Sequence, residues 1–103
     1  YKNAKVDLTS TDITTLYTAP AATTAVFKSI LVADDSGSTS TITLTLTDSA
    51  SAVFIIFSVK ATGASATVEL LTQPLVVQES EILKVTAANA NRLHVVGSYL
   101  EIT

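Results

Sequence analysis

The sequence contains no cysteine, which excludes several kinds of chemistry from the start. Thiolate nucleophiles, thiol redox reactions and structural zinc sites built on thiolates all need this residue. Long apolar runs are also missing, because the longest, residues 52–57, is far short of the roughly 20 residues that a membrane-spanning helix needs. We therefore expect no membrane partner, while the lack of disulfides leaves the cellular compartment open.

Basic residues and aromatic residues are both scarce. Lysine and arginine number 6 and are scattered along the chain, and the net charge is −3. Proteins that bind nucleic acid instead gather positive charge on one face. The three phenylalanines lie within apolar runs, where core packing explains them better than base stacking. The composition therefore indicates that nucleic acid is not a partner.

Hydroxyl groups take the place of charge on this chain. Charged residues make up 15% of it, whereas serine and threonine together make up roughly a quarter, far above ordinary usage. Such a surface stays hydrated but provides little of the charge repulsion that keeps monomers apart. The composition therefore favours a subunit that has neighbours, and we expect a homo-oligomer.

The clearest local pattern lies at residues 40–48, STITLTLTD, where aliphatic and hydroxyl side chains alternate strictly. The aliphatic residues are Ile42, Leu44 and Leu46, and threonines occupy positions 41, 43, 45 and 47. A period of two sends the two sets to opposite faces of a sheet. The stretch therefore predicts a strand with one face in the core and a threonine face in water or against a partner.

Further strands follow at a spacing of roughly ten residues, separated by turn residues. Residues 12–18 predict a short strand, with a capped helical turn as the alternative. Residues 25–34 predict a central strand, followed by a turn at 34–38 in which Gly37 can adopt positive φ. Residues 53–60 (VFIIFSVK) predict a strand covered on both faces. The remaining strands are expected at 66–71, 75–78, 81–87 and 92–103.

The start of the chain, residues 1–6, has no apolar stripe, so we expect an exposed arm or an edge strand there. Eight or nine short strands without a convincing helix describe an all-β fold. We therefore predict a single domain over residues 1–103, an antiparallel β-sandwich, with a jelly-roll-like arrangement or a small barrel as its possible forms.

No catalytic, cofactor-binding or metal-binding set of residues stands out. His94 is the only histidine, and no G-x-S-x-G motif selects a serine to act with it. Glu79 and Glu81 lie around an expected turn, where solvated charges are the usual finding. Asp34 and Asp35 precede Gly37, but their spacing does not match a calcium-binding loop. We therefore expect no catalytic residues, no cofactor and no metal.

Contacts with other subunits are expected at the start of the chain and at its only arginine. An unpaired edge strand invites pairing with a neighbour, in which Tyr1 and Val6 would serve as side-chain anchors beside Lys2. Arg92 could make a bidentate bond across a subunit interface, or it could simply be solvated. The predicted oligomer or shell contacts are therefore Tyr1, Lys2, Val6 and Arg92.

Three stretches of the chain resemble small virion proteins of tailed bacteriophages, especially marine phages and cyanophages. They are residues 8–34 (LTSTDITTLYTAPAATTAVFKSILVAD), 66–87 (ATVELLTQPLVVQESEILKVTA) and 94–103 (HVVGSYLEIT). Together they cover most of the chain. The resemblance implies a non-enzymatic β-sandwich subunit of a phage particle.

Such a subunit is expected to be a capsid decoration or cement protein on the surface of the virion head. Its partners would be the major capsid protein or other virion proteins, it would be present in the host cytoplasm during assembly, and its oligomer would be a homotrimer. Two alternatives remain open. One is a tail, fibre or baseplate module that binds the host surface, and the other is a secreted carbohydrate-binding or adhesive β-sandwich.

Overall fold

The computed structural model describes residues 1–35 and 37–103, and for Val59 it describes the backbone alone. Among the described residues there are nine strands and no helix. The strands are β1 (Lys2–Leu8), β2 (Thr14–Thr18), β3 (Thr24–Asp34), β4 (Ser40–Thr47), β5 (Val53–Thr62), β6 (Thr67–Glu69), β7 (Leu75–Val77), β8 (Ile82–Ala87) and β9 (Leu93–Ile102).

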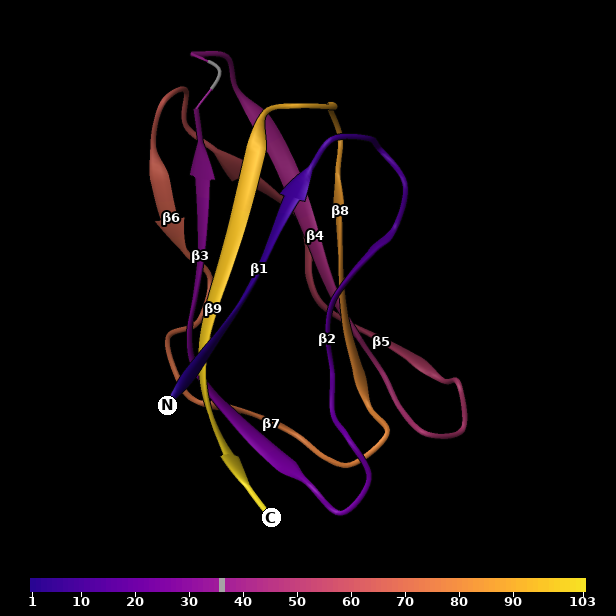
Figure 1. The fold of residues 1–103 in the computed structure, drawn as a ribbon. Coiled ribbons are helices and arrows are strands. Elements are labelled where there is room, and N and C mark those ends of the chain that lie inside the picture. The colour runs from indigo at the N-terminus through magenta and orange to yellow at the C-terminus, as the bar shows by residue number, and fades with distance from the viewer. Residues whose placement is uncertain (36) are drawn as a thin grey trace.

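The strands pair as if one long antiparallel hairpin had been rolled up. β1 pairs with β9, β2 with β8, β3 with both β6 and β7, and β4 with β5. Sheet A has the order β1-β9-β3-β6, with β7 also on β3, and sheet B has the order β2-β8-β4-β5 (Figure 1). This nesting is a jelly roll, so the predicted antiparallel sandwich of eight or nine strands is confirmed.

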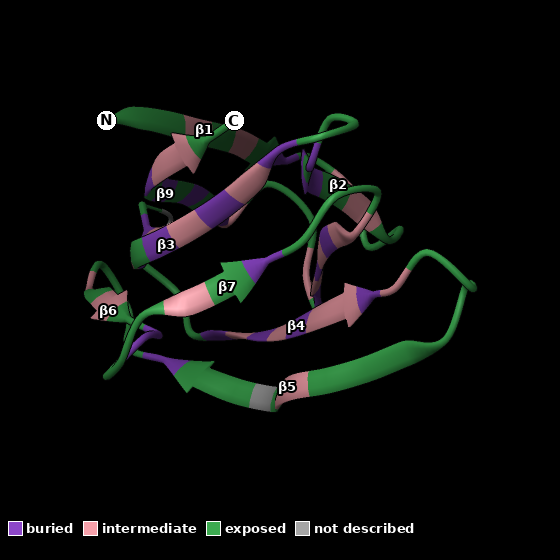
Figure 2. Ribbon diagram, turned by 90° about the horizontal axis from the view of Figure 1, so that it is seen from below, coloured by how far each residue is buried: buried purple, intermediate pink, exposed green. Residues whose placement is uncertain are grey.

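The core lies between the two sheets, and alternation along the central strands fills it (Figure 2). In β8, and in β9 as far as Tyr99, every second residue is buried, as the period of two requires. The largest side chains with under 2% exposure are Phe27, Leu8, Ile30, Ile42, Leu44, Leu70, Leu83, Leu93, Val32, Val77, Val85 and Val95. One close contact limits residue choice, because a Cβ at Gly97 would lie 2.7 Å from Phe27 Cε2.

The threonine strand forms as predicted, with one difference at its end. Ile42 and Leu44 are buried, and Leu46 packs against the core while remaining partly exposed. The threonines at positions 41, 43 and 45 are half-buried on the opposite face, but Thr47 is only 7% exposed. The expectation that all four hydroxyl groups stay in water is therefore wrong for Thr47.

Strand β5 differs more strongly from its prediction. It pairs with β4 alone and forms an edge of sheet B, and Val53, Phe54 and Ile55 are 61%, 55% and 64% exposed. The expectation that both faces of this strand are covered is wrong, because nothing among the described residues packs over its first half. The part of the prediction that concerned Val59 lies outside the described side chains.

The ends of the chain form neighbouring strands. β1 pairs with β9 alone, from Lys2 opposite Tyr99 to Leu8 opposite Leu93. It is therefore an edge strand along its whole length. Leu8 is buried, and Val6 packs partly against the core. Of the two expectations for residues 1–6, the edge strand is therefore correct. The strand expected at 12–18 is present as β2, and Gly37 has the expected positive φ, at 75°, although Ser36 of that turn lies outside the described residues.

Candidate functional site

The outer face of sheet A carries a patch of mixed apolar and charged side chains. Strand register sets Lys5, Val96 and Leu31 in one row across β1, β9 and β3, and sets Asp7 and His94 in the next row. All five side chains are exposed, including Leu31 at 40% and Val96 at 37%, because their neighbours along each strand point into the core. We call these five residues the sheet A patch.

A shallow hollow of about 260 Å³ lies within this patch, between β1 and β9. It is lined by residues of the two strands only, namely Lys5, Val6, Asp7, His94, Val95 and Val96. Val96 supplies exposed apolar surface, and a lysine, an aspartate and a histidine surround it, while Val6 and Val95 face the core. Such a combination of apolar surface with charged groups at its margin is typical of protein interfaces.

His94 sits between two carboxylates at one end of the hollow. Its Nε2 lies 3.2 Å from Asp7 Oδ1 and 3.6 Å from Asp35 Oδ2, and the three side chains are roughly half exposed. In a Ser-His-Asp relay the carboxylate and the nucleophile use different nitrogens of the ring. Here both aspartates contact the same nitrogen, so the arrangement orients the imidazole and links β9 to β1 and to the residue after β3.

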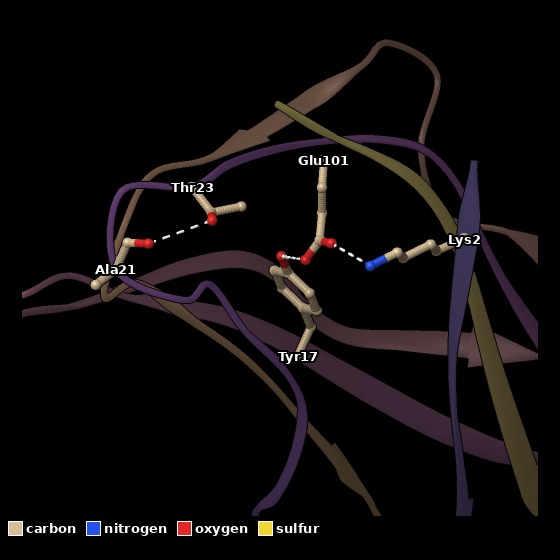
Figure 3. A network of polar contacts seen from close by, with 5 residues as sticks. All are labelled: Lys2, Tyr17, Ala21, Thr23 and Glu101. Atoms are coloured by element: carbon tan, nitrogen blue, oxygen red, sulfur yellow. Dashed lines mark hydrogen bonds and ion pairs between the residues drawn. The ribbon is translucent and has the colours of Figure 1, made fainter. Parts of the chain in front are cut away.

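A second polar cluster lies at the other end of β1, where Glu101 ties the two sheets together (Figure 3). Its Oε1 accepts a hydrogen bond from Lys2 Nζ at 2.6 Å, and its Oε2 accepts one from the Tyr17 hydroxyl at 2.7 Å. These bonds lower the pKa of Glu101 because they stabilise the carboxylate. The hydrogen bond from Lys2 likewise raises the pKa of that amine.

Three aromatic rings support this cluster from the core side. Tyr17 packs against Phe27 and Tyr99 with ring centroids 5.2 and 4.6 Å apart, and Phe27 stacks on Tyr99 at 4.8 Å. Burial disfavours the charged phenolate and raises the pKa of Tyr17, and the bond to Glu101 adds to this shift. The Tyr17 hydroxyl therefore remains a donor, and the cluster acts as a structural tie.

The four predicted contact residues are spread along the β1–β9 pair. Tyr1 is 79% exposed at the start of the chain, and Lys2 is bonded to Glu101 of its own subunit. Val6 lines the hollow while packing partly against the core. Arg92 precedes β9 at the far end, where its Nη1 donates to the Thr39 carbonyl at 2.7 Å. The structure thus gives Lys2 and Arg92 partners within the subunit.

The acidic pairs weighed in the sequence serve structural purposes. Asp34 is only 3% exposed at the end of β3, whereas Asp35 faces His94, and no metal-binding group of three or more His, Cys, Asp or Glu residues is found among the described residues. Glu79 accepts a hydrogen bond from the Ala22 amide, and Glu81 accepts one from the Gln78 amide at 2.7 Å. Both glutamates thus lie at the expected turn, and each also accepts a hydrogen bond from a backbone amide.

Sequence reasoning missed the exposed apolar residues of the sheets. Leu31 and Val96 belong to the sheet A patch, and Val53, Phe54 and Ile55 form the exposed part of β5. Each of these residues lies in an apolar run, and a run of this kind predicts a strand covered on both sides. Nothing in such a run signals that one side stays open, so only the arrangement of the two sheets reveals these surfaces.

No helix in the described part of the chain is long and apolar enough to cross a membrane. Comparison with protein-family models, with curated proteins and with solved structures found no match for this chain.

Proposed function

We propose that the chain is a non-enzymatic structural subunit of a tailed-phage particle, which binds the head shell as a decoration or cement protein. The sheet A patch is the observation that carries this proposal. Leu31 and Val96 offer apolar contact area on the outer face of sheet A, with the charged side chains of Lys5 and Asp7 and the imidazole of His94 at its margin. Contact surfaces between proteins combine apolar area of this kind with polar groups at the rim.

Three further features support the proposal. Jelly rolls recur in viral capsid domains, which is an analogy at the level of the fold. The resemblance of residues 8–34, 66–87 and 94–103 to phage virion proteins points the same way. The low charge suits a subunit that is held among neighbours. The proposed partner is the major capsid protein, and the proposed location is the head surface.

The aromatic residues favour this role over carbohydrate binding. Glycan-binding faces rely on exposed aromatic rings, and two of the three tyrosines, Tyr17 and Tyr99, are buried in the aromatic cluster. The exposed rings are Tyr1 at the start of the chain and Phe54 on β5 of the other sheet, so they do not form one platform. A shell contact through the sheet A patch needs no aromatic platform.

The proposal is tested with head shells of the encoding phage that have been prepared without this protein. Purified protein should co-sediment with the shells and raise the temperature at which they release DNA. Val96→Glu should lower shell occupancy at least tenfold, because it buries a charge at the centre of the contact. The matched control Val76→Glu alters a valine of β7, 48% exposed and outside the patch, and should bind normally.

Other outcomes would contradict the proposal in distinguishable ways. Binding to isolated tails and not to heads would overturn the head location and favour the tail or baseplate alternative. Binding to neither would overturn the virion role. Equal loss of occupancy in both variants would show that the sheet A patch is not the contact.

A further inference from the structure

The edges of the two sheets differ in how well they are protected against pairing with another chain. Each sheet has two edges, formed by β1 and by β6 with β7 in sheet A, and by β2 and β5 in sheet B. An edge strand exposes backbone N–H and C=O groups, and natural proteins block such edges with charges, short strands, proline or bulges.

Three of these edges carry such protection. β1 exposes the charged side chains Lys2, Lys5 and Asp7. β2 has five residues and a register shift, while β6 and β7 have three residues each and are separated by a segment that contains Pro74. None of the three offers a long, regular, uncharged strand.

β5 lacks this protection over its first half. It is ten residues long, Lys60 is its only charged residue, and Val53, Phe54 and Ile55 are each more than half exposed (Figure 2). Two register shifts against β4 interrupt the strand, but both lie beyond Ile55. The exposed apolar segment 53–55 is thus also the regular segment, in which the backbone can accept a further strand.

We propose that β5 pairs with β5 of a second copy of this chain, antiparallel and about a two-fold axis at Phe54. Val53 of one copy then lies opposite Ile55 of the other, and Phe54 lies opposite its own counterpart. Opposed residues of an antiparallel pair share a face at about 4.5 to 5.5 Å between Cα atoms, and aromatic and β-branched pairs are the favourable ones. The two sheets B join into one continuous sheet.

Charge complementarity selects a second copy in this orientation. In the pairing of β5 with β4, Phe54 lies opposite Leu46 and Lys60 lies opposite Ile42. Measured along β4, Lys60 is therefore four residue positions away from Phe54. The two-fold axis places Lys60 of the second copy the same distance on the other side, level with the turn at residues 48–52. The acid of that turn is Asp48, whose Oδ1 accepts hydrogen bonds from the Ala50 and Ala52 amides at 2.9 Å.

The arrangement therefore brings a lysine of one copy and an aspartate of the other to the same end of the paired segment. A parallel arrangement would instead set Lys60 beside Lys60. A closed three-fold ring would need β5 to pair with a different edge of the next copy, and the other three edges are protected. The β5 edge thus specifies a dimer, in place of the homotrimer expected from resemblance.

The first test is sedimentation equilibrium of the full chain over a range of concentrations. We expect a monomer–dimer equilibrium, because three exposed side chains per copy supply only part of the roughly 800 Å² per partner of a standard interface. Ile55→Lys should raise the dissociation constant at least tenfold, since it places charges on an apolar contact. The matched control Ile13→Lys changes a residue that is 69% exposed outside the strands and should leave it unchanged.

The second test uses the absence of cysteine from the chain. Phe54→Cys should form an intermolecular disulfide under mild oxidation, because the two-fold axis brings position 54 within disulfide reach of its counterpart. Ile13→Cys is the control and should cross-link slowly. A mixture of Val53→Cys and Ile55→Cys should form mainly the mixed dimer, and circular dichroism checks that each variant is folded.

A wild-type chain that stays monomeric at all concentrations would overturn the inference, as would Ile13→Cys cross-linking as fast as Phe54→Cys. Preferential linking of position 53 to position 53 would overturn the register. These measurements need no phage shells, so their outcome is independent of the proposed virion role.

Discussion

Glu101 shows how a single side chain can join the two sheets, at the end of the molecule where β1 begins and β9 ends. It comes from β9 in sheet A, and it holds Lys2 of β1 and Tyr17 of β2 through its two oxygens. Because β1 and β2 are edge strands of different sheets, the carboxylate connects elements that share no backbone ladder. The charge state of Glu101 therefore bears on how firmly this end of the molecule is closed.

We expect Glu101→Gln to lower stability at neutral pH and to have little effect in acid. The pKa of Glu101 in the folded chain is below its ordinary value of 4.5. A group with a lowered folded pKa stabilises the fold above its unfolded pKa, and this contribution is lost as the pH falls through the folded pKa. Urea unfolding of both proteins at pH 7 and at about pH 3 measures the difference. A deficit that is equal at both pH values would contradict the role of the charge.

Neighbouring residues of β4 should differ sharply in their sensitivity to truncation. Leu44 is 0% exposed in the core, whereas Thr45 is half-buried on the opposite face. We expect Leu44→Ala to cost about 2 to 5 kcal/mol of unfolding free energy and Thr45→Ala less than about 1 kcal/mol. Chemical denaturation measures both, and equal losses would mean that the register of the strand is wrong.

At the scale of the element, local patterns predict most strands, but they do not predict the neighbours that each strand acquires. The alternation in residues 40–48 predicted β4 because one face of that strand is in the core. The run at 53–60 is equally apolar, yet β5 became an edge strand because the nested pairing leaves it with β4 alone. The sheet A patch depends on a register between β1, β9 and β3, which joins residues far apart in sequence.

β3 contains a bulge, and a side chain of another strand accepts hydrogen bonds from the residues next to it. The register against β9 shifts between Phe27 and Ser29, and Glu69 from β6 fills the gap. The Ile30 amide donates to Glu69 Oε2 at 2.8 Å, and the Ser29 hydroxyl donates to Oε1. The glutamate thus supplies an acceptor that the bulged ladder lacks.

We expect Glu69→Ala to cost about 1 to 3 kcal/mol, because it leaves the Ile30 amide without its acceptor beside a fully buried side chain. Glu69→Gln keeps one amide oxygen as an acceptor and should cost less. Urea midpoints of the three proteins decide the matter. Identical midpoints for wild type and Glu69→Ala would show that the bulge does not depend on this carboxylate.

At the scale of the whole molecule, the two surfaces discussed above lie apart. One is the sheet A patch on the outer face of β1, β9 and β3, and the other is the edge of sheet B at residues 53–55. They belong to different sheets, so one contact need not block the other. On the two proposals made above, the shell and the second copy would therefore occupy different surfaces.

Calcium should leave the melting temperature of the whole protein unchanged. The Asp34 side chain is buried while Asp35 faces His94, so the two carboxylates do not share one ion. A ligand present at about 100 times its dissociation constant would add roughly 2.7 kcal/mol of stability, which makes a thermal scan with calcium or with a chelator a sensitive measurement. A rise with calcium that Asp35→Asn abolishes would contradict the expectation.

The nested pairing of the strands also sets the order in which the chain can fold. β4 and β5 are joined by a short turn, closed by a hydrogen bond from the Asp48 amide to the Ala52 carbonyl at 2.9 Å. Each outer pair must close a longer loop, up to β1 with β9, where Lys2 meets Tyr99. Since loop closure costs entropy before contacts repay it, folding should start at the β4–β5 hairpin and end with β1. β5, the strand proposed to dimerise, would then form early, and a second copy would have access to it before the two ends of the chain have met.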